Sequence, residues 1–323
     1  MPTREDFAQS EIISVPSFSK ALEICRDLRK KDLLKPYILS FDEGVSLGNF
    51  IFPYSHFYLL AKKGHVLKGS LYAKMKDEKG EELSTWKTAT LKVTGDDNLV
   101  EGFTIENNAG DPETKGQEVA LALYGDDNLF FNDTLLSTQD TLFVGPLPDD
   151  LSTRYIGFIP DNERYHEGNT HNRFLFNTIK GSVDFIFGAG KASFYHCDIV
   201  SVNDGRKEAY VSAPAHSLKD DFGFLFASCH FINGGVEKHS IYLARPWRDY
   251  GKSVFVSCTY DEHIKDEGFA EWNNEQRYRT ARFEEYPLQK ERVSWTKNQK
   301  SAPLPERYDE EIRLLEALAQ RLK

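Results

Sequence analysis

Two aspartates lie in apolar surroundings where a charged side chain is unexpected. Asp184 belongs to GSVDFIFGAG (181–190), whose Val, Ile and Phe residues are typical of a buried strand, and Asp140 belongs to TQDTLF (138–143). An unpaired charge in such a strand is costly, so each carboxylate should have a partner. When two carboxylates come into close contact, the pKa of one rises and that of the other falls. Such a pair can supply an acid and a base at once.

Three further side chains could complete a site around these carboxylates. Arg245, in LARPW (243–247), offers a compensating cation, and Gln117 and Gln139 are neutral donors suited to a developing oxyanion. Taken singly, such residues also fit ordinary structural roles, such as a turn cap or a solvated outer position. Together, two carboxylates, two amides and one guanidinium favour a functional site over coincidence.

The elements that must position these residues repeat along the chain. Six short segments begin with an apolar or aromatic residue: LVEGFT (99–104), LFFNDT (129–134), FLFNTI (174–179), FYHCDI (194–199), FASCHF (226–231) and FVSCTY (255–260). Their composition, and the turn-forming residues between them, predict strands. A motif that recurs every 20 to 45 residues or so is typical of a solenoid, and one strand cluster per repeat favours a parallel β-helix. A β-sandwich with chance similarity between strands remains the alternative.

The repeat also predicts where the two aspartates lie. The fourth residue of each segment should stack into an internal ladder, formed by Gly102, Asn132, Asn177, Cys197, Cys229 and Cys258. Asp140 follows Asn132 by eight residues, and Asp184 follows Asn177 by seven. These nearly equal offsets place both aspartates on one sheet, one coil apart. Neighbouring strands lie about 4.8 Å apart, so the two carboxylates should nearly touch.

The chain is predicted to form one domain over residues 1–323. SFSKALEICRDLRKK places several apolar side chains on one helical face, which predicts a helical N-terminal cap over about 1–35. The β-helix coils should fill about 36–297. A linker and the amphipathic DEEIRLLEALAQRLK predict a C-terminal helical tail over about 298–323.

Composition narrows the possible partners. The net charge of −10 and the lack of a Lys/Arg block argue against nucleic acid. No apolar run is long enough for a membrane span, and no secretion signal is recognisable at the N-terminus. Four cysteines without a CxxC pair fit a reducing compartment, so we expect a cytoplasmic protein, or a secreted one if a signal preceded Met1. We also expect a monomer. HEGNTH (166–171) lacks the helical spacing of a zinc site, and we expect no metal and no organic cofactor.

Four motifs carry a resemblance to a known family. GQEVALAL (116–123), TQDTLFVG (138–145), GSVDFIFGAG and YLARPW (242–247) occur in this order and together resemble the pectinesterase (pectin methylesterase) family. The resemblance covers most of residues 36–297 and implies an all-β, right-handed parallel β-helix. It also implies a carboxylic ester hydrolase that releases methanol from methyl-esterified homogalacturonan or oligogalacturonides.

The resemblance further implies a role for each candidate residue. Asp184 would be the nucleophile that attacks the ester carbonyl, and Asp140 would protonate departing methanol and then activate water. Gln117 and Gln139 would hold the oxyanion, Gln139 partly through orientation. Arg245 would hydrogen-bond Asp184 and keep it ionised.

Aromatic residues at matching positions would line a sugar-binding groove. They are Trp247, Phe143 and Phe187, with Trp272 as a further candidate. Strand alternation puts Phe187 on the face opposite the aspartate of its own strand. The strand must therefore bend or end near Gly188 for Phe187 to reach the groove.

Two features depart from the family pattern. The family usually has Ala where Glu118 stands and Gly where Ala244 stands, which could reshape the groove. A long insertion over 143–173 is predicted to form a loop over or beside the cleft. Three other functions remain open: a β-helix pectin lyase, a polygalacturonase, or a carbohydrate-binding β-helix without catalysis.

Overall fold

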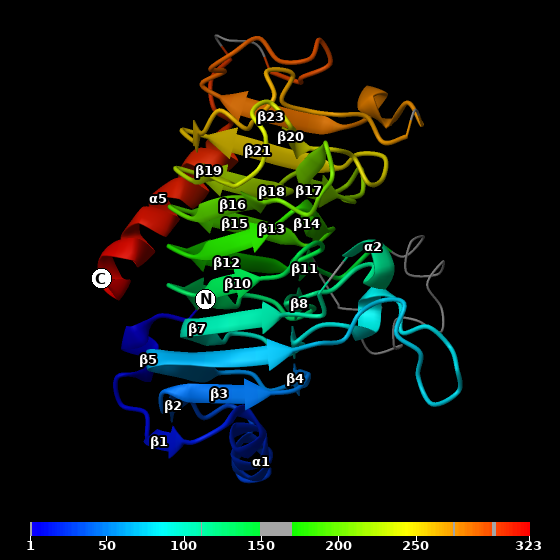
Figure 1. The fold of residues 1–323 in the computed structure, drawn as a ribbon. Helices are drawn as coiled ribbons and strands as arrows, with labels where there is room; N and C mark the ends of the chain where they lie inside the picture. Colours follow the sequence, from blue (N-terminus) through cyan, green and yellow to red (C-terminus); the bar gives the residue numbers. More distant parts are fainter. Residues whose placement is uncertain (1, 111, 149–169, 274, 299–301) are drawn as a thin grey trace.

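Parallel strands stack coil upon coil in the computed structural model, which describes residues 2–110, 112–148, 170–273, 275–298 and 302–323 (Figure 1). Successive coils pair strand to strand, and each pairing between the named strands is parallel, as in Thr134↔Thr178 and Thr178↔Asp198. The fold is the right-handed parallel β-helix that the repeats and the resemblance predicted, so the β-sandwich alternative is wrong.

Two sheets form the walls. The larger sheet contains β1 (Ile12–Val15), β2 (Tyr37–Phe41), β3 (Gly44–Leu47), β5 (Phe57–Gly69), β7 (Leu99–Asn107), β9 (Leu129–Phe131), β10 (Thr134–Leu136), β12 (His171–Leu175), β13 (Thr178–Gly181), β15 (Lys191–Tyr195), β16 (Asp198–Val202), β18 (Phe224–Ala227), β19 (His230–Gly234), β21 (Lys252–Val256), β22 (Thr259–Tyr260) and β23 (Arg282–Tyr286). The smaller sheet contains β4 (Phe50–Phe52), β6 (Leu91–Val93), β8 (Leu121–Leu123), β11 (Leu142–Val144), β14 (Val183–Gly188), β17 (Ala209–Pro214) and β20 (Ile241–Ala244). Neighbouring strands of each sheet come from successive coils.

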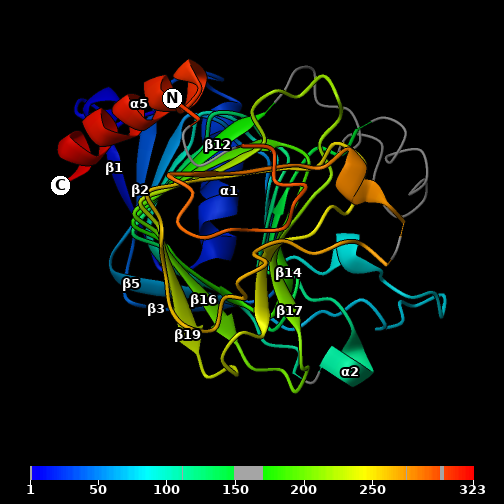
Figure 2. The same cartoon turned by 90° about the horizontal axis from the view of Figure 1, so that it is seen from above.

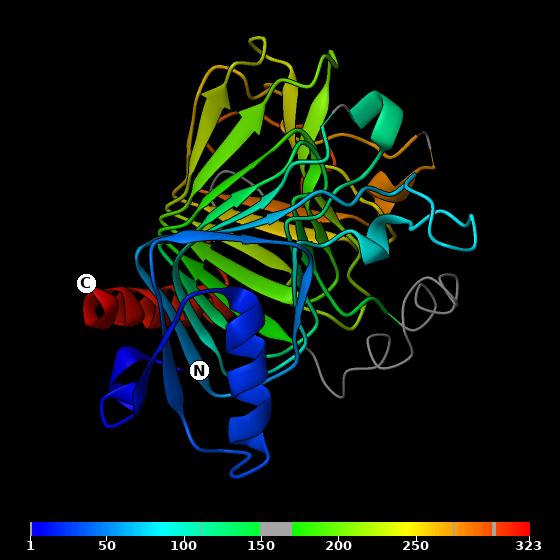
Figure 3. The same ribbon diagram turned by 60° about the horizontal axis from the view of Figure 1, so that its bottom comes forward.

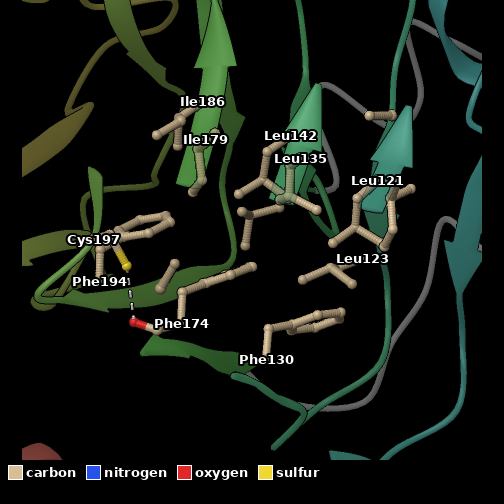
Figure 4. Close-up of a cluster of buried hydrophobic side chains, with 14 of the residues drawn as sticks. Leu121, Leu123, Phe130, Leu135, Leu142, Phe174, Ile179, Ile186, Phe194 and Cys197 are labelled. Atoms are coloured by element: carbon tan, nitrogen blue, oxygen red, sulfur yellow. Dashed lines mark hydrogen bonds between the residues drawn. The ribbon is translucent and has the colours of Figure 1, made fainter. Parts of the chain in front are cut away.

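Stacked aromatic rings fill the interior. Phe130, Phe174, Phe194, Phe226 and Phe255 form one column, with ring centroids 5.1, 4.9, 4.7 and 4.9 Å apart. Figure 4 shows its first three rings, Phe130, Phe174 and Phe194. The column follows from the register, because each phenylalanine occupies the same position in successive paired strands. Repetition of one residue type per coil therefore builds the core.

The internal ladder is displaced by one residue from its predicted position in the first two coils. Strand register aligns Phe103 and Asp133 with Asn177 and the three cysteines, so the prediction of Gly102 and Asn132 as ladder members was wrong. Both predicted residues precede the ladder and have positive φ, 80° and 56°. The chain turns a corner there, and Gly and Asn tolerate the left-handed conformation that the corner requires.

The ladder residues hydrogen-bond the backbone of the neighbouring coil. Asp133 Oδ1 accepts from the Phe103 N–H at 2.7 Å, and Asn177 Oδ1 accepts from the Asp133 N–H at 2.6 Å. The Cys197 thiol donates to the Phe174 carbonyl at 3.3 Å, and the next two cysteines repeat this pattern. All four cysteines are buried and free. Burial raises the pKa of the Cys229 thiol well above its ordinary value, so these cysteines are structural side chains rather than nucleophiles.

Helices cover the end and the side of the solenoid. Helix α1 (Phe18–Arg29) lies across the N-terminal end of the core, inside the outline of the coils when the molecule is viewed along its axis (Figures 2 and 3). Helix α5 (Glu306–Leu322) lies along the outside of the larger sheet (Figure 1). The other helical segments in the described part of the chain are short: α2 (Pro112–Lys115) and 3₁₀ turns at Arg4–Phe7, Thr85–Lys87 and Arg277–Arg279. Among the residues that the structure describes, no helix has the length and hydrophobicity needed to cross a membrane.

Candidate active site

A cavity of about 230 Å³ opens on the outer face of the smaller sheet. Most of its lining comes from the coils of β8, β11, β14 and β17 and from loops that follow β20, and the lining residues are Ser84, Thr85, Trp86, Gln117, Asp140, Asp184, Phe187, Ala213, Trp247 and Trp272. Six residues predicted from the sequence as catalytic or substrate-binding are in this list. The solenoid thus brings together six predicted side chains that are up to 155 residues apart in the sequence, from Gln117 to Trp272.

The stacking of β11 on β14 places the two aspartates side by side. Leu142 pairs with Ile186, so Asp140 and Asp184 occupy equivalent positions two residues earlier in their coils. The Asp140 N–H donates to the Val183 carbonyl at 3.2 Å. Measured from the true ladder residues, Asp133 and Asn177, both aspartates follow by seven residues.

Both aspartates have a left-handed backbone conformation, with φ of 58° at Asp140 and 51° at Asp184. In β14 the register with β17 shifts between Val183 and Ile186, so the regular alternation of side chains is broken at Asp184. This irregularity is the bend that the sequence analysis required for Phe187, although it lies at Asp184 rather than near Gly188. It allows Asp184 and Phe187 to line the same cavity.

Arg245 compensates the charge of Asp184. Its Nε and Nη2 donate to the two carboxylate oxygens at 2.8 and 2.6 Å, in a bidentate pair whose side chains are 15% and 13% exposed. The guanidinium carbon lies 3.8 Å from the ring centroid of Tyr210 and 4.1 Å from that of Trp272. Two aromatic rings therefore clamp the guanidinium, which fixes the direction of the carboxylate.

Asp140 is the member of the pair whose pKa is raised. Burial raises the pKa of its carboxyl group well above the ordinary value, and the charge of Asp184 raises it further. Arg245 and Arg206 oppose this shift without cancelling it. One carboxyl group is thus held as an acid beside a second that is bound to a guanidinium.

The two glutamines have different surroundings. Gln117 lines the cavity. Gln139 does not; its side chain is buried, and its Oε1 accepts from Nη1 of Arg206 at 2.8 Å. Glu118, one of the departures from the family pattern, is also buried and accepts from the backbone N–H groups of Ala109 and Thr138 at 2.8 and 3.0 Å. It tethers the segments that carry the two glutamines.

Three of the four predicted aromatic residues line the cavity: Phe187, Trp247 and Trp272. Phe143 does not, in contrast to the expectation. Its side chain is 1% exposed, and its ring packs 5.1 Å from Trp86 and 5.2 Å from Phe187, centroid to centroid. Trp86 covers Phe143 and forms that part of the wall.

Sequence reasoning missed Trp86, Arg206 and Tyr210. The tryptophan belongs to a 3₁₀ turn far from the four motifs, and its only sequence signal is a large aromatic residue in a polar stretch. Tyr210 pairs with Val183 in the coil next to that of Asp184, but it lies 13 residues after the ladder residue Cys197, so the offset of seven residues does not lead to it. The predicted insertion loop lies largely in residues 149–169, outside the described residues.

Solved structures of known proteins share this fold. This parallel β-helix has the fold of solved pectin methylesterases. Pectin methylesterase PemA from Erwinia chrysanthemi superposes with a TM-score of 0.70 at 19% identity over 94% of both chains. The carrot enzyme gives a TM-score of 0.67 at 19% identity over 92% of this chain and 85% of its own.

The chain belongs to the pectinesterase family, whose family model matches residues 62–147 and 168–304. Pectinesterase QRT1 of Arabidopsis thaliana is 31% identical over 229 residues, which cover 68% of this chain and 52% of the relative. Pectinesterase 31 of the same plant is 30% identical over 220 residues, which cover 66% of this chain and 60% of the relative. The matched region thus spans little more than half the length of these curated relatives.

Proposed function

We propose that the protein is a pectin methylesterase that hydrolyses the methyl esters of polygalacturonate and releases methanol. One observation carries the proposal: a carboxylate held by a bidentate arginine lies next to a second carboxyl group, whose pKa is raised, in one cavity. Family membership supports the same substrate class. A solved pectin methylesterase with a TM-score of 0.69 to this chain was crystallised with a hexasaccharide.

In the first half of the reaction, Asp184 acts as the nucleophile. An oxygen of its carboxylate attacks the ester carbonyl carbon, and the carbonyl oxygen becomes an oxyanion that Gln117 can stabilise by donating a hydrogen bond. The bond to the methoxy oxygen then breaks. Asp140 gives its proton to that oxygen, so methanol leaves and an acyl-enzyme anhydride remains.

In the second half, Asp140 acts as a base. Its carboxylate takes a proton from a water molecule as the water oxygen attacks the acyl carbon. The bond to the Asp184 oxygen breaks, which restores the Asp184 carboxylate and the protonated Asp140. The product is the free galacturonic acid carboxyl group, which then loses its remaining proton to solvent. Arg245 stabilises Asp184 as attacking group and as leaving group, because its clamped guanidinium stays in place throughout.

The aromatic wall supports binding of the sugar next to the scissile ester. Phe187, Trp247 and Trp272 present apolar surface in the cavity that contains the aspartates. Aromatic faces bind the apolar faces of sugar rings and the uncharged methyl ester.

A methanol assay on methylated pectin tests this function. Wild-type protein should release methanol and leave the chain length unchanged, whereas Asp184→Ala should release none above background while retaining its circular-dichroism spectrum. Asp198→Ala, a matched change at an exposed aspartate of β16, should behave as wild type. Unsaturated products or shortened chains without methanol would instead indicate a lyase or a polygalacturonase, and binding without products would indicate a carbohydrate-binding protein.

Other properties remain predictions. Comparing polymeric pectin with short methylated oligogalacturonides would identify the preferred chain length. Size-exclusion chromatography would test the expected monomer. The expected cytoplasmic location gains no support from the relatives, and cell fractionation would distinguish it from secretion.

A further inference from the structure

The loop between β16 and β17 reaches back to the coil of Asp140. In this loop Arg206 donates from Nη1 to Oε1 of Gln139 at 2.8 Å. Arginine has no acceptor, so the glutamine must face it with its oxygen. Because that oxygen is engaged, the amide NH₂ is the group that Gln139 can offer in other directions. The contact therefore makes Gln139 a donor, which is the polarity that an oxyanion needs.

The same loop is anchored to the coil of Asp184. Ser182, two residues before that aspartate, donates from Oγ to Oδ2 of Asp204 at 2.6 Å. Oδ1 of Asp204 accepts from the Arg206 N–H at 3.2 Å, and Oδ2 lies 3.4 Å from the Arg206 Nη1. The Asp204 side chain is 2% exposed, so this anchor is buried. One loop thus contacts the segments that precede both aspartates.

Arg206 also contributes to the charge balance at Asp140. Burial and the charge of Asp184 raise the pKa of Asp140, while Arg245 and Arg206 lower it. Arg245 is already bound to Asp184 through both carboxylate oxygens. Removal of Arg206 would therefore change the pKa of Asp140 and leave the ion pair between Arg245 and Asp184 intact.

We propose that Arg206 is a positioning residue for ester hydrolysis, which holds Gln139 as a hydrogen-bond donor and adds positive charge near Asp140. The proposal rests on the proposed function, because it assigns Gln139 and Asp140 their parts in that reaction. Arg206 is not among the residues that line the cavity, so it acts through its neighbours.

Three variants separate the hydrogen bond from the charge. Arg206→Ala removes both, and Arg206→Lys keeps the charge without the planar fork. Lys207→Ala is the matched control, since it removes the same charge from an exposed neighbour that has no hydrogen bond or ion pair to any described residue. Each variant is assayed for methanol release from methylated oligogalacturonides across a pH series, with circular dichroism to verify folding.

We expect Arg206→Ala to lower kcat by roughly 10-fold to 100-fold, with little change in KM, because a misdirected donor weakens stabilisation of the transition state. Its alkaline limb of kcat/KM should move to higher pH, since losing the cation raises the pKa of Asp140. Arg206→Lys should keep the wild-type alkaline limb, and Lys207→Ala should match wild type throughout. In a Gln139→Ala background, Arg206→Ala should lower kcat far less than in wild type.

Two results would overturn the proposal. One is an Arg206→Ala enzyme with unchanged kcat and an unshifted alkaline limb. The other is a loss of kcat equally large in the Gln139→Ala background with no shift of the limb, which would indicate a general structural role. If wild-type protein itself releases no methanol, the proposed function fails instead, so the two failures are distinguishable.

Discussion

Asp133, at the inner corner of the solenoid, and Asp140, in the outer cavity, are both carboxyl groups whose pKa is raised well above its ordinary value, chiefly by desolvation. Asp133 receives a backbone N–H on Oδ1, and its Oδ2 has no hydrogen-bond partner among the described residues. Asp140 lines a cavity, with Asp184 and two arginines as charged neighbours. A raised pKa therefore does not by itself distinguish the proposed catalytic acid from a structural carboxyl group. The two groups differ in their access to a cavity and in the charges around them.

The largest difference in activity should appear when each of these two aspartates is replaced by asparagine. Asp140→Asn removes the proposed proton donor and base, so methanol release should fall by roughly 10² to 10⁴-fold. Asp133→Asn copies the ladder residue of the next coil, Asn177, and should leave kcat and KM unchanged. Steady-state methanol assays on the folded variants measure both effects. Equal losses in the two variants would contradict the distinction.

Two buried ion pairs extend the comparison. Arg245→Met should lower kcat about 100-fold, because the Asp184 carboxylate loses two hydrogen bonds and is no longer held in one orientation. Arg292→Met breaks the structural pair with Glu285, in which both side chains are 2% exposed. That change should cost about 3 kcal/mol of unfolding free energy and leave the kcat of the folded fraction intact. Urea unfolding and activity, measured on both variants, should therefore separate the two pairs.

Trp247 in the cavity wall and Phe143 behind it should also differ: replacing Trp247 should affect substrate binding, and replacing Phe143 should affect stability. Trp247→Ala removes a cavity-lining ring, and we expect KM to rise about tenfold, from the loss of one aromatic contact with the sugar. Phe143→Leu changes a ring behind the wall, and it should lower the unfolding free energy by about 1 kcal/mol with little effect on KM. A larger rise of KM in the leucine variant would place Phe143 in the groove after all.

The smallest effect concerns stability as a function of pH. A carboxyl group with a raised pKa keeps its proton in the folded state while the unfolded chain has lost it. Stability should therefore decrease as pH rises from the ordinary carboxyl range to the folded-state pKa. Asp133→Asn removes one such group, so its urea midpoint should fall less with pH than that of wild type. Parallel curves for the two proteins would show that Asp133 is not the source.

Much of the architecture could be predicted, because a solenoid repeats one short pattern. The stacking of Asp140 and Asp184 followed from counting residues along two coils. The count was off by one at Asn132, since a small polar residue at a left-handed corner looks like the ladder residue beside it. The error did not change the sheet or the pairing, because the correct ladder residue, Asp133, makes the two offsets equal.

Contacts made by loops could not be predicted in this way. Arg206 meets Gln139 across 67 residues, and Trp86 covers Phe143 from a turn between distant strands. Neither contact belongs to the repeat, so no periodic signal marks it. The irregularity at Asp184 is also invisible in the sequence, which by strict alternation would place Phe187 on the opposite face.

Helix α5 gives the stacked coils a mechanical link that adjacent pairing does not provide. Its buried side chains belong to one apolar cluster with Leu129, Leu175, Leu225 and Val254, which come from β9, β12, β18 and β21. A solenoid held only by neighbouring contacts can fray one turn at a time from either end. Because helix α5 packs against several coils, unfolding of a terminal coil would also disturb the contacts of the helix with the other coils. Thermal unfolding should therefore occur in one sharp transition rather than coil by coil.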